Sequence, residues 1–176
     1  IREKEKKFKN AKKLLESGEL KKYEYSDGRY CIVSPGSIKD IYEEGIVLKH
    51  CIHTCDIYFQ RMDIRETYLL FLRRTDKPDV PWYTLEIEPG GNIRQKKSVL
   101  NEAYKDLDDA MPFLKKWQQW VKKNLSAKDK KLAEKSDKAR KDGYKQLREE
   151  KKLIWHGRLQ GTLLADALEN DFMEVV

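Results

Sequence analysis

Three short segments that favour β-strands follow one another between residues 67 and 98, and they constrain the fold more than any other feature of the chain. TYLLFLRR (67–74) is apolar and β-prone, WYTLEIE (82–88) alternates in strand fashion, and NIRQKKS (92–98) follows the glycines of PGGN. Tight turns of this kind join strands that run antiparallel. The centre of the chain is therefore predicted to be an antiparallel sheet.

A second strand pair is predicted nearer the N-terminus. LKKYEYSDGRYCIVSP places aromatic and β-branched residues on both sides of Asp27-Gly28, which is the strongest two-residue hairpin signal. We expect strands at about 21–26 and 29–33, beside the three-stranded meander. The sheet then has about four to five strands.

Helical periodicity marks the rest of the chain. Ser37 can cap a helix that begins at Ile38 and that Gly45 ends or bends, and a further helix is expected from Val47 to about Met62. Other predicted helices lie at 2–17, from 107 to about 125 with an entry or kink at Pro112, at 126–152 with an interruption at Gly143, and within 153–176. The predicted fold is α+β, with a basic helix (1–20), an α+β core (21–125) and a charged helical extension (126–176) that ends in a docking helix.

The positive charge of the chain lies in two flanks. The net charge is +7, and residues 1–22 carry nine Lys or Arg against four Asp or Glu, while residues 126–152 carry eleven against six. The stretch between them is balanced in charge up to residue 125. Basic flanks could bind phosphate groups, because each neutralised phosphate releases a counterion. The alternative is that they are solvated helix faces with ion pairs four residues apart.

LKHCIHTCDIYF (48–59) holds two of the three histidines and two of the three cysteines. On a helix, Cys51 and Cys55 share one face and His50 and His53 another, and positions 50 and 51 diverge by roughly 100°. One metal ion could not be reached from both faces, and only one cysteine and one histidine remain elsewhere as further ligands. We therefore predict no metal site and two buried cysteines, and nothing in the chain indicates a cofactor.

A spaced set of residues in the middle of the chain matches a family pattern. The set comprises Glu44-Gly45, Leu48, His50-Cys51, Ile52, Phe71-Leu72-Arg73, Pro81, Thr84-Leu85-Glu86, Gln95 and Asn101. With the strands and turns around it, the chain from about Val33 to Val121 resembles the C-terminal conserved region of the PcfJ-like family. The resemblance implies a protein of bacterial conjugative plasmids, phages or other mobile elements. It implies no settled biochemical role.

The matching polar residues of types that catalysis uses are His50, Arg73, Thr84, Glu86, Gln95 and Asn101. Thr84 and Glu86 lie two positions apart on a strand and share a face, which His50 and Arg73 could approach from neighbouring elements. One hypothesis is an enzyme in which His50 and Glu86 form an acid/base pair and Arg73 holds a nucleotide or another phosphate-bearing substrate. The alternative is structural: Arg73 and Glu86 form a cross-strand ion pair, and His50 bonds a buried backbone group.

Basic and aromatic side chains on or beside the meander indicate a different function. They are Arg73, Arg74, Trp82, Arg94, Lys96 and Lys97. An antiparallel sheet with such residues could bind a nucleic-acid strand, with aromatic rings stacking on bases. We favour nucleic-acid binding, with the enzyme as its alternative. A protein partner bound by the terminal helices is the third hypothesis.

The sequence carries no sign of a membrane segment or of secretion. No apolar run approaches the roughly 20 residues of a membrane span, and no signal-peptide pattern is present. Three cysteines in this arrangement are more typical of reduced thiols than of a disulfide framework. We therefore expect a cytoplasmic protein without a membrane partner. Because the first residue is Ile1, we also expect a fragment of a longer protein.

Overall fold

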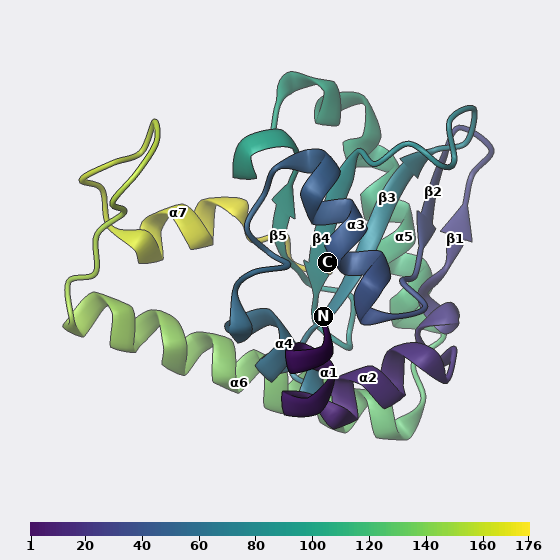
Figure 1. Cartoon of the computed structure of the whole chain (residues 1–176), viewed down its shortest axis with the longest axis horizontal. Coiled ribbons are helices and arrows are strands. Elements are labelled where there is room, and N and C mark those ends of the chain that lie inside the picture. The colour runs from purple at the N-terminus through teal and green to yellow at the C-terminus, as the bar shows by residue number, and fades with distance from the viewer.

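A computed structural model describes all 176 residues and has at its centre a five-stranded antiparallel sheet. The strands follow one another in chain order, so the sheet is a simple meander (Figure 1). They are β1 (Tyr25–Ser26), β2 (Tyr30–Val33), β3 (Tyr68–Arg74), β4 (Tyr83–Ile87) and β5 (Ile93–Lys97). The prediction of an α+β fold with four to five antiparallel strands is confirmed.

The first hairpin turns at Asp27-Gly28 as predicted. Gly28 has a φ of +92°, a backbone conformation that residues with a Cβ rarely adopt, and a side-chain oxygen of Asp27 accepts the N–H groups of Arg29 and Tyr30 at 2.9 Å each. The strand expected at 21–26 is largely wrong. Residues 21–23 belong to a 3₁₀ helix, η1 (Glu19–Tyr23), and only the last two residues, β1, are strand.

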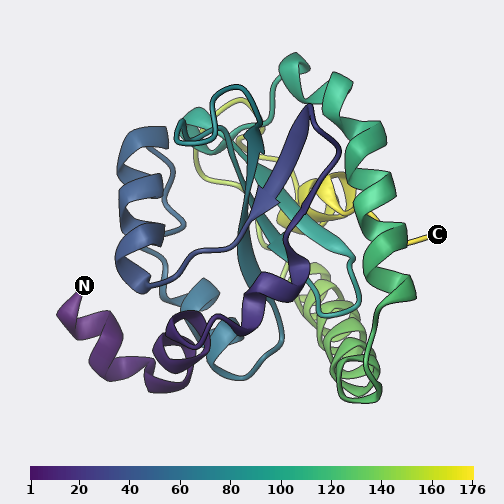
Figure 2. The same cartoon turned by 90° about the vertical axis from the view of Figure 1, so that its right-hand side faces the viewer.

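Helices cover both faces of the sheet, with α3 and α5 on opposite sides (Figure 2). The α-helices are α1 (Arg2–Lys7), α2 (Lys9–Glu16), α3 (Ile38–Leu48), α4 (Asp56–Asp63), α5 (Met111–Lys123), α6 (Ala127–Glu149) and α7 (Leu164–Asp171). Two further 3₁₀ helices are η2 (Val99–Asn101) and η3 (Lys105–Ala110). None of these helices combines the length and apolar character that crossing a bilayer requires.

The helix expected from Val47 to Met62 is wrong in its first half. Lys49 has a φ of +54°, which ends α3 at Leu48, and α4 begins only at Asp56. Residues 50–55 therefore form a turn between two helices. The sequence pattern therefore predicts one helix where the structure has the end of α3, a turn and α4, because periodicity does not reveal the left-handed residue between them. The prediction that both cysteines are buried also fails, since Cys51 is exposed and Cys55 is half-buried.

Gly45 does not end or bend α3, which continues through it. A Cβ at this position would lie 1.9 Å from Nδ1 of His53, so the glycine instead makes room for the imidazole of the following turn. The interruption expected at Gly143 is likewise absent, because α6 is continuous from Ala127 to Glu149. A single glycine costs a helix only about 1 kcal/mol relative to alanine, so the remaining residues of α3 and α6 keep both helices continuous.

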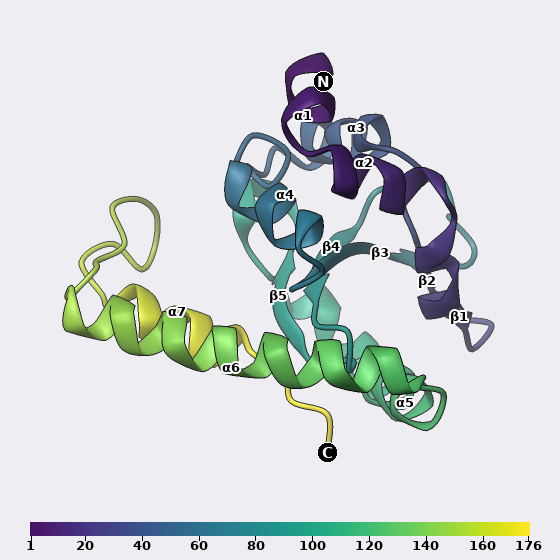
Figure 3. The same cartoon turned by 90° about the horizontal axis from the view of Figure 1, so that it is seen from below.

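The C-terminal segment contacts the sheet again after helices α6 and α7. Ser126 caps α6, which extends past the core with α7 beside it (Figure 3). Met173 then pairs with Ile93 through two backbone hydrogen bonds of 2.8 and 2.9 Å, and this covers part of the open edge of β5.

The two faces of the sheet differ in chemistry. The face toward α5 is apolar and aromatic: Trp117 of α5 is fully buried, and Tyr30 packs against Phe113. The opposite face carries Thr84 and Glu86 of β4, which are buried under other elements of the chain. Buried polar groups are nearly always hydrogen-bonded, so the side chains that bond this polar face define a candidate site.

Candidate functional site

Strand β4 presents a row of polar side chains to this face, each with separate partners. The first is Thr84, whose hydroxyl lies 2.9 Å from Nε2 of His50 in the turn after α3. His50 is only 2% exposed, and its burial lowers the pKa of the imidazole to about 4. The ring is therefore neutral near pH 7, and its Nδ1 has no hydrogen-bond partner.

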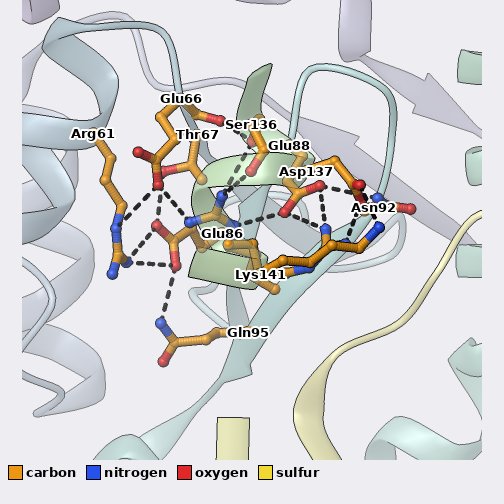
Figure 4. Close-up of polar contacts among 12 residues, drawn as sticks. Arg61, Glu66, Thr67, Glu86, Glu88, Asn92, Gln95, Ser136, Asp137 and Lys141 are labelled. Atoms are coloured by element: carbon orange, nitrogen blue, oxygen red, sulfur yellow. Dashed lines mark hydrogen bonds and ion pairs between the residues drawn. The ribbon is translucent and has the colours of Figure 1, made fainter. Parts of the chain in front are cut away.

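Glu86, the second of the row, is completely buried and accepts hydrogen bonds from three side chains. Arg61 of α4 donates at 3.0 Å, Thr67 at 2.7 Å and Gln95 of β5 at 2.9 Å (Figure 4). Both carboxylate oxygens are thus engaged. Of the four groups, Arg61 alone has a side chain with substantial exposure, at 26%.

Beyond the end of β4, Glu88 joins the sheet to α6. Nε of Arg94 and Nη1 of Arg140 lie 2.7 and 2.6 Å from its carboxylate, and Arg94 also donates to Glu66 at 2.7 Å and to Ser136 (Figure 4). A register shift beside Glu86 leaves Arg94 without a cross-strand partner, and such a bulge re-aims the side chain it carries. The network fixes α4, the sheet and α6 to one another.

A cavity of about 80 Å³ lies within this network, and its lining is balanced in charge. The charged residues that line it are three arginines and two carboxylates: Arg61, Arg94, Arg140, Glu66 and Glu86. Gln95, Tyr144 and apolar side chains of α6 and α7 complete the lining. Glu88, just outside this lining, supplies a third carboxylate to the arginines. Sites for small organic ligands typically measure about 300 to 1,000 Å³. Size and charge therefore mark this cavity as part of the ion-pair network.

The other predicted catalytic residues are held by different partners. Arg73 makes a two-pronged ion pair with Glu44 of α3, while burial raises the pKa of Glu44 and Arg73 opposes that rise. Asn101 accepts the backbone N–H of Cys51 at 2.8 Å. His50, Glu86 and Arg73 share one face of the sheet, but no hydrogen bond or ion pair joins any two of them. The cross-strand pair of Arg73 with Glu86, the structural alternative, does not form.

The basic residues predicted to bind nucleic acid are mostly committed to internal partners. Arg73, Arg94 and Lys96 are buried, and the ammonium of Lys96 lies 3.0 Å from a carboxylate oxygen of Asp171. Trp82 is also buried and donates its indole N–H to Asp106 at 2.8 Å. Lys97 and Arg74 are partly exposed. These six side chains do not form an exposed face, because helices and loops cover both sides of the sheet.

An exposed cluster of lysines lies elsewhere, on α5 and the first half of α6. Eight lysines without an ion-pair partner form this lysine surface: Lys115, Lys116, Lys122, Lys123, Lys128, Lys130, Lys131 and Lys135. Within residues 111–136 the acids are Glu134, which is exposed, and Asp129, which is buried against Lys22. Asp27, in the first hairpin turn, lies near Lys116, and Glu19, in η1, lies near Lys128. The cationic excess is large nonetheless.

Sequence reasoning missed the α5 half of this surface because it counted charges by segment. Residues 23–125 are balanced in total, but their acids include Glu44, Glu86 and Glu88, which are buried against arginines. The lysines of α5 are therefore not neutralised in space. The repeated Lys-Lys pairs at 115–116, 122–123 and 130–131 are the sequence signal that could have found the surface.

No group of three or more His, Cys, Asp or Glu side chains is arranged to hold a metal ion. The imidazoles of His50 and His53 lie 6.2 Å apart between ring centroids, and His53 packs edge-on against Tyr42. The turn that carries the two histidines and two cysteines is thus built from packing contacts and the hydrogen bonds of Thr84 and Asn101.

An antiparallel meander with helices on both faces and one buried polar face defines an α+β protein. The family model described as PcfJ-like protein matches residues 1–111, more than half of the chain, so the chain belongs to the PcfJ-like family. The match begins earlier than the resemblance from Val33 suggested, since it includes α1, α2 and the first hairpin, and it stops at the start of α5. Neither the curated proteins nor the solved structures searched include a match.

Proposed function

We propose that this PcfJ-like protein binds nucleic acid through the lysine surface of α5 and α6. The observation that carries the proposal is the set of eight exposed lysines without ion-pair partners, with a single exposed acid, Glu134, within residues 111–136. Lysine side chains of this kind contact phosphates without regard to sequence, and the release of counterions drives the association.

The positions of these lysines along α5 support a continuous contact area. Lys115, Lys116, Lys122 and Lys123 fall within about one third of the helix circumference at 3.6 residues per turn. The opposite side of α5 carries Phe113, Leu114 and Trp117, which are buried against the sheet. Because α6 begins only four residues after α5 ends, its first lysines extend the same basic area.

The geometry favours binding over the enzyme alternative for this site. His50, Glu86 and Arg73 each have their own partners, and reaching a substrate would require breaking buried hydrogen bonds. The family resemblance further supports, as part of the same proposal, a protein of a plasmid or phage that works in the cytoplasm. A protein partner for the terminal helices is compatible with the lysine surface but has no contact of its own to support it.

The test is fluorescence anisotropy with a labelled 20-nucleotide single strand and its duplex, in salt from 50 to 300 mM. Binding should weaken steeply with salt, and the variant Lys122→Glu/Lys123→Glu should bind more weakly with a salt slope reduced by about 2. The same loss should appear on unrelated oligonucleotide sequences, because phosphate contacts carry no base readout.

The matched control is Lys9→Glu/Lys39→Glu, which makes the same charge change on α2 and α3. Both residues are exposed. Helices α2 and α3, which carry them, lie away from α5 on the other side of the sheet (Figure 2). Circular dichroism and urea unfolding should show all variants folded, since exposed substitutions usually change stability by less than about 0.5 kcal/mol. No binding at 50 mM salt, or equal losses in both double variants, would contradict the proposal.

A further inference from the structure

A loop after α6 carries the most exposed tryptophan of the protein. Trp155 is 77% exposed in the segment 151–163, which stands at the end of α6 distant from α5 (Figure 3). The segment is an ordered hairpin: Ile154 and Thr162 share a backbone hydrogen bond of 2.9 Å, as do Gly161 and Ile154. Tryptophan is enriched at binding interfaces because its large ring is apolar and its N–H is polar, so an exposed indole on a hairpin is available to a partner.

The surroundings of Trp155 are cationic. An open hollow of about 360 Å³ is lined by Trp155, Leu153, Lys151, Lys152 and Glu150. Neither of these lysines has an ion-pair partner, and residues 151–165 contain Arg158 and His156 but no acid. Glu150 is the one negative group at the rim. An apolar protein surface would leave these cations unpaired, whereas an anionic ligand with a flat apolar part would match both features.

We propose that this hollow binds an unpaired base of a single-stranded nucleic acid. Trp155 stacks on the base, and Lys151 and Lys152 contact the phosphates beside it. The inference rests on the nucleic-acid binding proposed above and adds a preference for single strands, because a base inside a duplex is stacked and its faces are covered.

The length of α6 allows one nucleic-acid strand to contact both the lysine surface and the hairpin that carries Trp155. The helix has 23 residues, so about 35 Å separate its ends. A flexible single strand can lie on the lysine surface and still reach the hairpin. The exposed side of α6 between them also carries Lys145, which has no ion-pair partner, whereas Lys138 is paired with Asp142.

The experiment compares the full chain with Trp155→Ala, Trp155→Phe and Leu159→Ala on the labelled single strand and its duplex. The alanine variant at 155 should bind the single strand at least fivefold more weakly, with a change of less than twofold on the duplex. Phenylalanine should restore most of the affinity because it still stacks. Leu159→Ala is the matched control, an exposed apolar residue of the same hairpin outside the hollow. Indole emission of the unaltered protein should be quenched by oligothymidylate, and this quenching should fall in Trp155→Phe.

Equal single-strand affinity of the unaltered protein and Trp155→Ala overturns the inference while leaving duplex binding, and hence the proposed function, intact. If the unaltered protein binds neither the single strand nor the duplex, the inference and the proposed function are both overturned. A further measurement tests binding of the unaltered protein and of Trp155→Ala to vesicles with and without phosphatidylglycerol. Vesicle binding that needs Trp155, combined with unchanged single-strand affinity, would replace the base with a lipid surface as the ligand.

Discussion

Nη1 of Arg140 on α6 lies 2.6 Å from both carboxylate oxygens of Glu88, which follows β4. The two residues are 52 positions apart in the chain, and both are almost fully buried. The guanidinium of Arg140 also lies over the ring of Phe172, 4.0 Å from its centroid. One arginine therefore links the long helix to the sheet and to the segment that follows α7.

Replacing Arg140 with methionine should loosen α6 from the core. Breaking a buried ion pair typically costs about 3–5 kcal/mol, and we expect the lower end because Arg94 still bonds Glu88. Urea unfolding measures the loss, and amide exchange should show reduced protection within α6. Lys138→Met, which removes an exposed pair with Asp142, is the control and should cost less than about 1 kcal/mol. Similar losses in the two variants would show that the Arg140 contact is no stronger than a surface pair.

Arg73 and Glu44 should behave as a coupled pair. Arg73→Met leaves the Glu44 carboxylate buried without its partner, so we expect a loss of about 3–5 kcal/mol in the free energy of unfolding. The double variant Arg73→Met/Glu44→Met leaves no buried charge and should be more stable than Arg73→Met. Additive losses in the complete double-mutant cycle would rule out this coupling.

Two helical glycines should respond in opposite ways to alanine. Gly45→Ala places a Cβ against His53 and should destabilise the protein by about 1–3 kcal/mol, as overpacking usually does. Gly143→Ala has open space around its Cβ and should stabilise α6 by about 0.5–1 kcal/mol. Thermal unfolding measures both. The loss at Gly45 should shrink when His53 is also replaced by alanine, and its persistence in that background would place the clash elsewhere.

Stability should fall with acidification partly through His50. Its pKa is about 4 in the folded chain, and its ordinary value is 6.5, so the unfolded chain binds the proton first as the pH falls. The contribution is complete above about pH 6.5 and is lost as the pH falls toward 4, with a loss on the order of 2 kcal/mol between pH 7 and pH 5.

Urea unfolding at several pH values should show a flatter dependence in His50→Gln than in the unaltered protein. His53, whose pKa burial also lowers, is present in both proteins, so its own protonation largely cancels in the comparison. Lys97, whose positive charge disfavours the charged imidazole of His50, is also present in both. His156→Gln is the control at an exposed histidine and should keep the original slope. A slope in His50→Gln equal to that of the unaltered protein would show that His50 is protonated to the same extent in both states.

Local patterns predicted most of the secondary structure because each pattern reports on its own neighbourhood. The Asp27-Gly28 turn, the cap at Ser37 and the meander from residue 67 all rest on interactions within a few residues. The errors fall where a single backbone conformation interrupts a periodic stretch. Lys49, at φ +54°, is the clearest case, since the identity of a lysine does not indicate a left-handed backbone conformation.

The candidate site was less accessible from the sequence. Alternation correctly placed Thr84 and Glu86 on one face of the sheet, and His50 does approach that face. Partner choice was not predictable, because Arg73 could have met either of two buried carboxylates and the fold brings it Glu44. The register shift that redirects Arg94 likewise has no local signal in IRQKK.

The class of fold, the order of the strands and the positions of most helices could be predicted from the amino-acid sequence, since these follow from periodicity and turn chemistry. Which charged side chains are ion-paired and which are unpaired became visible only in the packed chain. Burial against a partner distant in the chain removes Arg73, Arg94 and Lys96 from the surface, whereas the lysines of α5 remain unpaired. The physical reason is that an ion pair depends on the distance between two groups in space, which only the packed chain fixes.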